Sequence, residues 1–297
     1  MQKIFIKDIQ EGSEFVSTFM VMKIVIEDKD EIVAFLGDKT GDIKAVMPNK
    51  ETVKVGDILK VNAVKEEILK ISDFTRIDKF EIKEYLPVVN KSIDKIMDEI
   101  DLISKQEFKS EEAKCLDNYF FGNESFVEKF KSGIAGLRQH HNYIGGLAEH
   151  TLNVMYLAKT LSYRYDIRYK EIAILASKLH DIGKIIEYNT QGPFTTTLEG
   201  DLKGHIVIGS MMIEEAFKSN PSLYSDEFKN RILACIIQHH GKVEYGSPKA
   251  ANTEESFIVH YADYVDANLN KIEQIRNITE KNTWSEYDRR IGTRLYM

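Results

Sequence analysis

The sequence has few cysteines and no long hydrophobic run. Only two of the 297 residues are cysteines, Cys115 and Cys235, and they have neither paired nor metal-type spacing. The N-terminus carries charge every few positions and has no apolar core, so we expect no secretory signal and predict reduced thiols in a cytoplasmic protein. No run approaches the roughly 18 consecutive apolar residues of a spanning helix, so we expect no membrane partner.

Basic residues are also in the minority. The chain has 40 Lys+Arg against 47 Asp+Glu, a formal charge of −7. The first 90 residues hold 14 basic and 17 acidic side chains, and the rest hold 26 and 30. Neither part has the strongly basic character of a tight duplex-DNA binder. A polyanionic substrate would therefore need local positive charge, such as bound metal ions.

The first 85 or so residues are patterned as β-strands. Runs rich in Val, Ile and Phe, separated by Gly-Asp and Pro-Asn turn signals, predict strands at 15–28, 31–38, 41–48, 57–67 and 68–78. Five short strands suggest a small closed barrel, and the pattern DKTGDIKAVM followed by VKVGDILKV resembles nucleic-acid-binding OB-fold domains. Phe35 and Phe74 are candidates either for base stacking or for the barrel core.

Helical spacing replaces the β pattern after Pro87. It predicts helices at 92–104, 111–121 and 124–133, and no proline interrupts the chain between Pro87 and Pro193. The fold class is therefore multidomain β plus α. We predict an OB-fold barrel at 1–88, a helical linker at 89–135 and an all-α domain at 136–297.

All eight histidines lie between residues 140 and 260, and none falls in the first 139. A single buried histidine is more often structural than functional, but the grouping and the acids beside it favour a site. The eight are His140, His141, His150, His180, His205, His239, His240 and His260.

The segment LHDIGK carries the strongest local signal. Apolar spacing predicts a helix over 174–184, on which His180 and Asp181 lie about 100° apart and can face one cleft. Lys184 is i+4 from His180 and i+3 from Asp181, so it shares that face. A buried structural His-Asp pair would explain the dyad but not the lysine.

The other candidates lie on predicted helices. His150 projects from a helix at 146–161, and His205 follows Gly204 at the start of another. His239 and His240 close a helix that Gly241 would stop. Asp263 lies in an apolar helix, where a lone carboxylate needs a partner.

In chain order these residues read H…HD…H…HH…D, the signature of HD-domain metal-dependent phosphohydrolases. The strings HHNYIGGLAEH (140–150), LHDIGK (179–184), GHIVIGS (204–210), QHHGKVEYGSP (238–248) and HYADYVDA (260–267) resemble the YhaM family of 3′–5′ exoribonucleases. Those proteins place an OB-type domain before the HD domain, so the resemblance covers nearly the whole chain.

The resemblance implies a ligand set and two divalent ions. One ion would use His150, His180, Asp181 and Asp263, and a second would share Asp181 with His205, His239 and His240. Some HD proteins bind a third ion through a Glu four residues before the first histidine, where this chain has Gly146, so we predict two. The family implies manganese; the ligand types leave Fe²⁺, Co²⁺, Zn²⁺ and Mg²⁺ open.

The implied reaction is hydrolysis of single-stranded RNA from its 3′ end to nucleoside 5′-monophosphates, with single-stranded DNA left open. A hydroxide bridging the two metals would attack phosphorus, and Lys184 would donate to a phosphate oxygen. The family string His141-Asn142-Tyr143 would contact substrate or form a cap and loop before the His150 helix.

Other interpretations stay open at this stage. A phosphohydrolase or phosphodiesterase acting on small nucleotides would leave the barrel unexplained, and an inactive HD scaffold would not need every metal position filled. His260 and Asp266 can brace the site or be ordinary core and solvated residues. The tail 284–297 mixes Trp, Tyr and arginines, which suits either stacking on bases or packing. The sequence does not specify oligomeric state and is compatible with a homo-oligomer.

Overall fold

A computed structural model describes residues 3–137 and 141–297. The chain divides into two compact units. One comprises Met1–Val88 with Asn189–Phe194, and the other comprises Val89–Tyr188 with Thr195–Met297. Within the described residues, no helix combines the length and the apolar character needed to cross a membrane.

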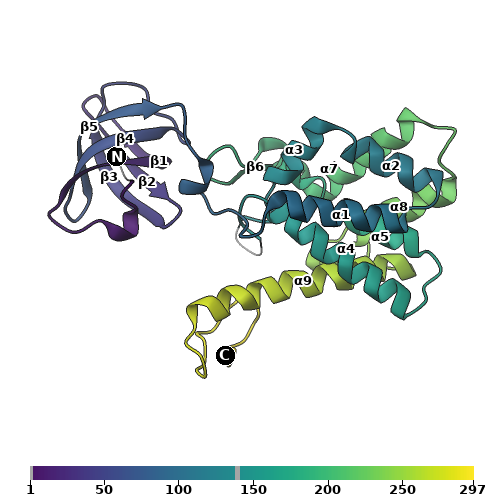
Figure 1. The fold of residues 1–297 in the computed structure, drawn as a ribbon. Helices are drawn as coiled ribbons and strands as arrows, with labels where there is room; N and C mark the ends of the chain where they lie inside the picture. Colours follow the sequence, from purple (N-terminus) through teal and green to yellow (C-terminus); the bar gives the residue numbers. More distant parts are fainter. Residues whose placement is uncertain (1–2, 138–140) are drawn as a thin grey trace. The chain divides into compact units, whose positions relative to one another are not determined.

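The first unit is built on a closed five-stranded barrel (Figure 1). Its strands are β1 (Glu14–Glu27), β2 (Glu31–Asp38), β3 (Gly41–Pro48), β4 (Ile58–Lys65) and β5 (Leu69–Ile77). They pair in the order β1-β2-β3-β5-β4, and β4 closes the barrel on β1. The β3–β5 pairing is parallel and the others are antiparallel. This OB-like barrel confirms the predicted fold, with strand bounds within two residues of those expected.

The barrel core forms because its strands alternate. In β4, Leu59, Val61 and Ala63 are buried while the residues between them point outward. The register shifts after Val21 in β1, and such irregularities let one long strand bend and pair on both edges. Phe74 is 1% exposed and belongs to this core, so it offers no face for base stacking.

The second unit is helical, as predicted. Its helices are α1 (Ile93–Glu107), α2 (Glu111–Phe121), α3 (Glu124–Ser132), α4 (Gly146–Arg164), α5 (Lys170–Leu179), α6 (Lys184–Glu187), α7 (Leu198–Ser219), α8 (Asp226–Gln238) and α9 (Glu254–Ile278). The expectation of an all-α domain needs one small amendment, because the two-residue strands β6 (Tyr188–Asn189) and β7 (Thr195–Thr196) pair between α6 and α7.

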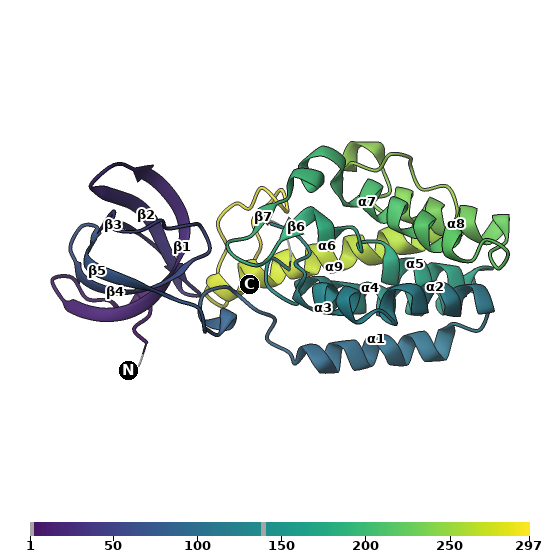
Figure 2. The same ribbon diagram turned by 90° about the horizontal axis from the view of Figure 1, so that it is seen from above.

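Helices α4, α5 and α9 pack on one another, and α8 packs on α5 (Figure 2). The apolar spacing read from the sequence becomes a single buried cluster that includes Leu147, Leu175, Ile232 and Val259. Since these side chains face one another, the polar residues that interrupt the same faces are buried with them. The histidines and aspartates of the predicted site are such interruptions.

Candidate metal centre

Residues 180–183 form a turn instead of continuing a helix. Helix α5 ends at Leu179 and α6 begins at Lys184, so the single helix predicted over 174–184 is wrong. Gly183 lies at this break in close contact with α7, because a Cβ there would be 2.1 Å from the carbonyl oxygen of His205. Glycine therefore lets the turn that carries Asp181 press against α7.

Helix α7 is interrupted just before His205. Gly204 has φ 71° and ψ 158°, a non-helical conformation that glycine adopts readily. Helical backbone resumes at His205, as the sequence predicted, but a further helical stretch from Leu198 precedes the break. The interruption brings His205 to face the turn after α5.

Asp181 lies at the middle of the gathered side chains. Its Oδ2 is 3.4 Å from His150 Nε2 and 3.3 Å from His180 Nε2. Its Oδ1 is 3.6 Å from His205 Nε2 and 3.7 Å from His239 Nε2. The two carboxylate oxygens thus face two different groups of histidines, which is the geometry of a bridging ligand.

The group on the Oδ2 side also contains Asp263. His150 Nε2 lies 3.3 Å from Asp263 Oδ1 and 3.2 Å from His180 Nε2. We call His150, His180 and Asp263 the first subsite.

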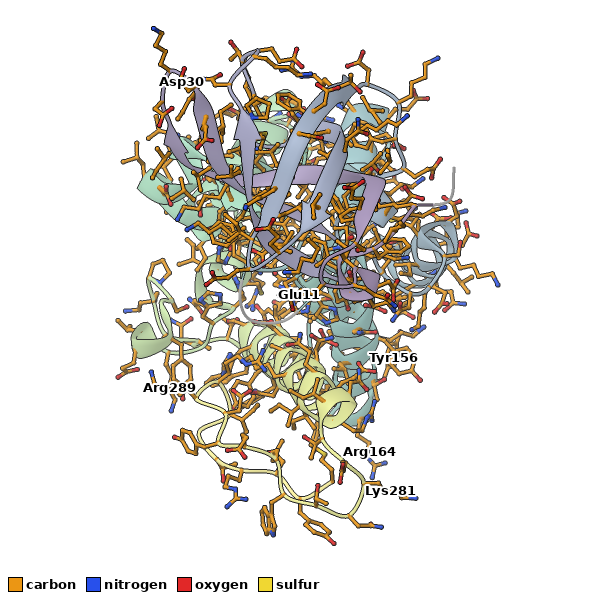
Figure 3. The ribbon with its side chains drawn as sticks, turned by 90° about the vertical axis from the view of Figure 1, so that its left-hand side faces the viewer. Glu11, Asp30, Tyr156, Arg164, Lys281 and Arg289 are labelled. Atoms are coloured by element: carbon orange, nitrogen blue, oxygen red, sulfur yellow. The ribbon has the colours of Figure 1, made fainter. Side chains whose placement is uncertain are left out.

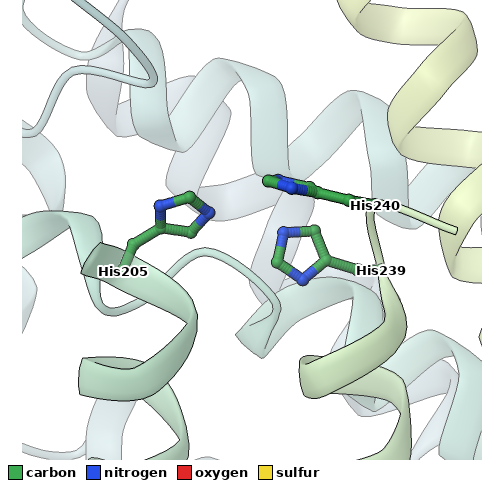
Figure 4. A group of neighbouring side chains, drawn as sticks. All are labelled: His205, His239 and His240. Carbon is green, nitrogen blue, oxygen red and sulfur yellow. The ribbon is translucent and has the colours of Figure 1, made fainter. Parts of the chain in front are cut away.

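The group on the Oδ1 side is formed by His205, His239 and His240, which we call the second subsite (Figure 4). One nitrogen of each ring can be chosen so that all three lie within 4.8 Å of one another. The ring centroids of His205 and His240 are 5.3 Å apart. The structure therefore brings together all seven predicted ligands, from α4, the turn after α5, α7, the end of α8, and α9.

The ring orientations are held from behind. The Nδ1–H of His180 donates to the carbonyl of Ser177 at 2.8 Å, and that of His239 donates to the carbonyl of Ile236 at 2.7 Å. Because a carbonyl only accepts, each Nε2 is left with a lone pair directed at Asp181. Burial, reinforced by the neighbouring His240, lowers the pKa of His239 well below 6.5, so this ring is neutral.

These residues fit divalent cations. Among the described residues, four buried atoms of this centre have no hydrogen-bond partner: Asp181 Oδ1, His205 Nε2, His239 Nε2 and His240 Nδ1. A metal with bonds of about 2.1 Å places neighbouring ligand atoms about 3.0–3.5 Å apart, close to the spacings around Asp181. Imidazole and carboxylate donors suit Mn²⁺, Fe²⁺, Co²⁺ or Zn²⁺ and do not choose among them.

The carboxylates of the centre are ionised. Burial opposes ionisation of Asp181, but the positive charge of Lys184 and the neighbouring His180 lower its pKa well below 3.8. Burial likewise opposes ionisation of Asp263, and hydrogen bonding to His150 lowers its pKa far below its ordinary value. Lys184 Nζ donates to Asp181 Oδ2 at 2.6 Å and is almost fully buried, so it shares the face predicted for it and contacts the bridging aspartate.

Asp266 braces the first subsite. Its Oδ2 accepts from His150 Nδ1 at 2.6 Å and lies 2.8 Å from His141 Nε2. Its Oδ1 accepts from Asn153 at 2.8 Å. Such carboxylates fix the orientation of a ligating histidine and raise its basicity. The sequence left Asp266 open between bracing and solvation, and its i+3 spacing from Asp263 was the available signal.

Glu187 has the matching place in the second subsite, and the sequence analysis missed it. Its Oε2 lies 3.1 Å from His205 Nδ1, and its Oε1 accepts the backbone N–H of His205 at 3.3 Å. These contacts join residues 18 positions apart, and no spacing along a single helix indicates them.

The string His141-Asn142-Tyr143 lies in the loop before α4. His141 is buried and its Nδ1 lies 2.7 Å from the hydroxyl of Tyr143, while Asn142 is half-buried. His141 thus contacts Tyr143 through Nδ1 and Asp266 through Nε2. His140 lies outside the described residues.

Three further positions have defined surroundings. Gly146 has no room for a side chain, because a Cβ there would lie 2.1 Å from the carbonyl oxygen of His141. The carboxylate of Glu149 accepts from the hydroxyl of Tyr143. His260 Nδ1 donates to the carbonyl of His239 at 3.0 Å, so it is a buried histidine that also holds the backbone of a second-subsite residue.

Comparison with known protein families agrees with a metal centre in the helical domain. The HD domain family model matches residues 147–268. The matched range contains both subsites, Lys184, Glu187 and Asp266, and it begins just after the His141–Tyr143 loop. The fold and the match together describe an OB-like barrel followed by a helical HD domain, which indicates a metal-dependent phosphohydrolase.

Proposed function

We propose that this protein is a 3′–5′ exoribonuclease of the YhaM type, which hydrolyses single-stranded RNA to nucleoside 5′-monophosphates. The observation that carries the proposal is Asp181, whose two oxygens face two histidine subsites with unpartnered buried atoms. That arrangement suits two metal ions side by side, and such two-metal sites recur in enzymes that cleave phosphodiesters.

Divalent ions bound there, with Mn²⁺ proposed, would supply an activated water and neutralise charge on the phosphate. The chain's own residues prepare that chemistry. Asp181 presents one oxygen to each subsite while Lys184 holds its Oδ2. Lys184 has two further N–H groups, which can donate to a phosphate oxygen as charge develops.

The barrel supports a polymeric substrate over a free nucleotide. OB-type barrels bind single strands through stacking and backbone contacts with little sequence preference. A barrel ahead of an HD domain is also the arrangement of the YhaM family that the sequence resembles. An enzyme for small nucleotides would not need that domain.

The test uses purified protein and a 5′-labelled single-stranded RNA, incubated with Mn²⁺ or with EDTA. We expect a ladder that shortens from the 3′ end only with Mn²⁺ and releases nucleoside 5′-monophosphates. The same strand as DNA reports the sugar preference.

An intact oligonucleotide, in protein shown by elemental analysis to hold metal, would contradict the exonuclease proposal. Release of phosphate or a monophosphate from free nucleotides by that same sample would instead support the small-nucleotide alternative.

A further inference from the structure

The chain after α9 folds back on itself as a hairpin, residues 282–297, which we call the C-terminal hairpin. The backbone N–H of Ser285 donates to Leu295 at 2.8 Å, and that of Asp288 donates to Thr293 at 3.1 Å. These bonds pair the two arms antiparallel, with Trp284 opposite Tyr296.

The C-terminal hairpin exposes aromatic rings. Trp284, Tyr287 and Tyr296 have exposed fractions of 59%, 61% and 60%. Trp284 and Tyr296 form a cross-strand pair with centroids 5.5 Å apart, and the guanidinium of Arg294 lies 5.8 Å from the Trp284 ring. Paired rings on a hairpin are held in place before any ligand binds, so little ordering cost is left.

The C-terminal hairpin is also locally basic in an acidic protein. Residues 282–297 contain three basic and two acidic side chains, and Lys281 directly precedes them, whereas the whole chain has a net charge of −7. Lys281 and Arg289 project from this segment in Figure 3. Within residues 3–137 and 141–297, Lys281, Arg289 and Arg294 form no salt bridge, so their charges are available to an anion.

A chain of hydrogen bonds ties the C-terminal hairpin to the loop before α4. Arg290 donates to the side-chain oxygen of Gln274 at 2.7 Å, and Gln274 donates to Asn270 Oδ1 at 3.0 Å. The same Asn270 oxygen accepts the backbone N–H of His141 at 3.0 Å. The hairpin is therefore anchored to the side of the domain where His141 contacts Asp266, the carboxylate behind His150.

Lys271 follows Asp263 by eight residues on α9. Burial lowers its pKa, while the charges of Asp263, Arg290 and Asp288 also act on it. Gln274, where the hairpin is anchored, follows Asp263 by 11 residues, about 16 Å along a helix. A strand longer than a dinucleotide can span that distance.

We propose that the C-terminal hairpin binds the single strand that leads into the metal centre, with Trp284 and Tyr296 stacking on bases and Arg294 and Arg289 contacting phosphates. The proposal rests on the exoribonuclease function. Aromatic rings interleaved with unpaired cations suit single-stranded nucleic acid, because every base has a stacking face and every linkage carries a negative charge.

The experiment measures binding of fluorescein-labelled oligoribonucleotides of 2, about 6 and about 12 nucleotides by fluorescence anisotropy, with EDTA present to prevent cleavage. We expect Trp284→Ala and Tyr296→Ala each to weaken binding of the longest strand about tenfold, with a deficit that shrinks as the strand shortens. Arg294→Gln should reduce the salt dependence of binding by about 0.7 in the log–log slope.

The matched control is Tyr165→Ala, an exposed tyrosine (72%) beyond the other end of α4, where Arg168 contacts the first turn of α9. It should bind as the wild type does. Circular dichroism reports whether each variant is folded, and light scattering reports its mass.

Two results would overturn the hairpin proposal: wild-type affinity in folded Trp284 and Tyr296 variants, or an affinity loss that accompanies a change in oligomeric mass, which would make the hairpin a contact between copies of the chain. Failure of the exoribonuclease function has a separate signature. In that case the wild type would not bind the longest strand in EDTA, and the metal-loaded wild type would not cleave it.

Discussion

The two subsites around Asp181 differ in charge. The first contains Asp263, shares Asp181 and is backed by Asp266. Three carboxylates therefore lie within 3.4 Å of His150. Burial lowers the pKa of His150, but hydrogen bonding to these aspartates outweighs it and raises the pKa well above 6.5. The second subsite has three imidazoles, shares Asp181 and has Glu187 behind His205, so it has one carboxylate fewer than the first. Burial lowers the pKa values of both His239 and His240.

This difference teaches how one protein can hold two ions with unequal strength. Negative charge concentrated in a buried place attracts a dication strongly, because the effective dielectric constant is low there. Neutral imidazoles bind through their lone pairs alone and gain less from charge. We therefore expect the first subsite to retain its ion at lower free metal than the second.

The largest effect is expected for Asp181→Ala, because this residue serves both subsites. Loss of the shared carboxylate should reduce the bound metal from two ions per chain to at most one, and should lower hydrolysis about 1000-fold or more. Elemental analysis and single-turnover cleavage measure the two quantities. Wild-type activity in the variant would contradict the bridging assignment.

The expected difference in metal affinity between the two subsites can be tested by removing one ligand from each. Asp263→Asn should weaken the tighter of two Mn²⁺ binding phases by removing a negative charge, whereas His239→Ala should abolish only the weaker phase. Calorimetric titration of metal-free protein resolves the phases. A single phase that is equally affected by both substitutions would show that the subsites are not unequal.

The carboxylates behind the ligating histidines should affect metal affinity less than the ligands themselves, and one lies behind each subsite. Asp266→Asn should lower metal affinity at the first subsite by about 10- to 100-fold, since an amide holds the His150 ring less well and lowers its basicity. Glu187→Gln is the matched change behind His205 and should affect the second subsite alone. If Asp266→Asn leaves both affinities intact, Asp266 serves only packing.

The smallest effect on metal is expected for Lys184→Gln. This side chain contacts Asp181 but offers no lone pair to an ion, so both ions should remain bound while kcat falls about 10- to 100-fold through the lost donor to phosphate. Metal content measured beside kcat and KM separates the roles. Loss of metal in this variant would mean that Lys184 serves mainly to hold Asp181.

Local pattern was sufficient for the barrel strands but not for every helix. Alternation placed the five barrel strands within two residues, because the side-chain period of a half-buried strand is visible in the chain. The ligands that meet around Asp181 were predicted from the resemblance to HD-domain proteins, not from local pattern. The prediction of one helix over 174–184 was wrong, and nothing in those residues indicates that Gly183 lies against the carbonyl of His205.

The sequence by itself determined which residue types are available for the chemistry and which elements carry them. Only the tertiary structure decided which of these residues contact one another at the metal centre. It directs one oxygen of Asp181 to each subsite and places Glu187 behind His205 and Asp266 behind His150. The physical reason is that these contacts join different helices, and their geometry depends on how buried faces pack rather than on any period along the chain.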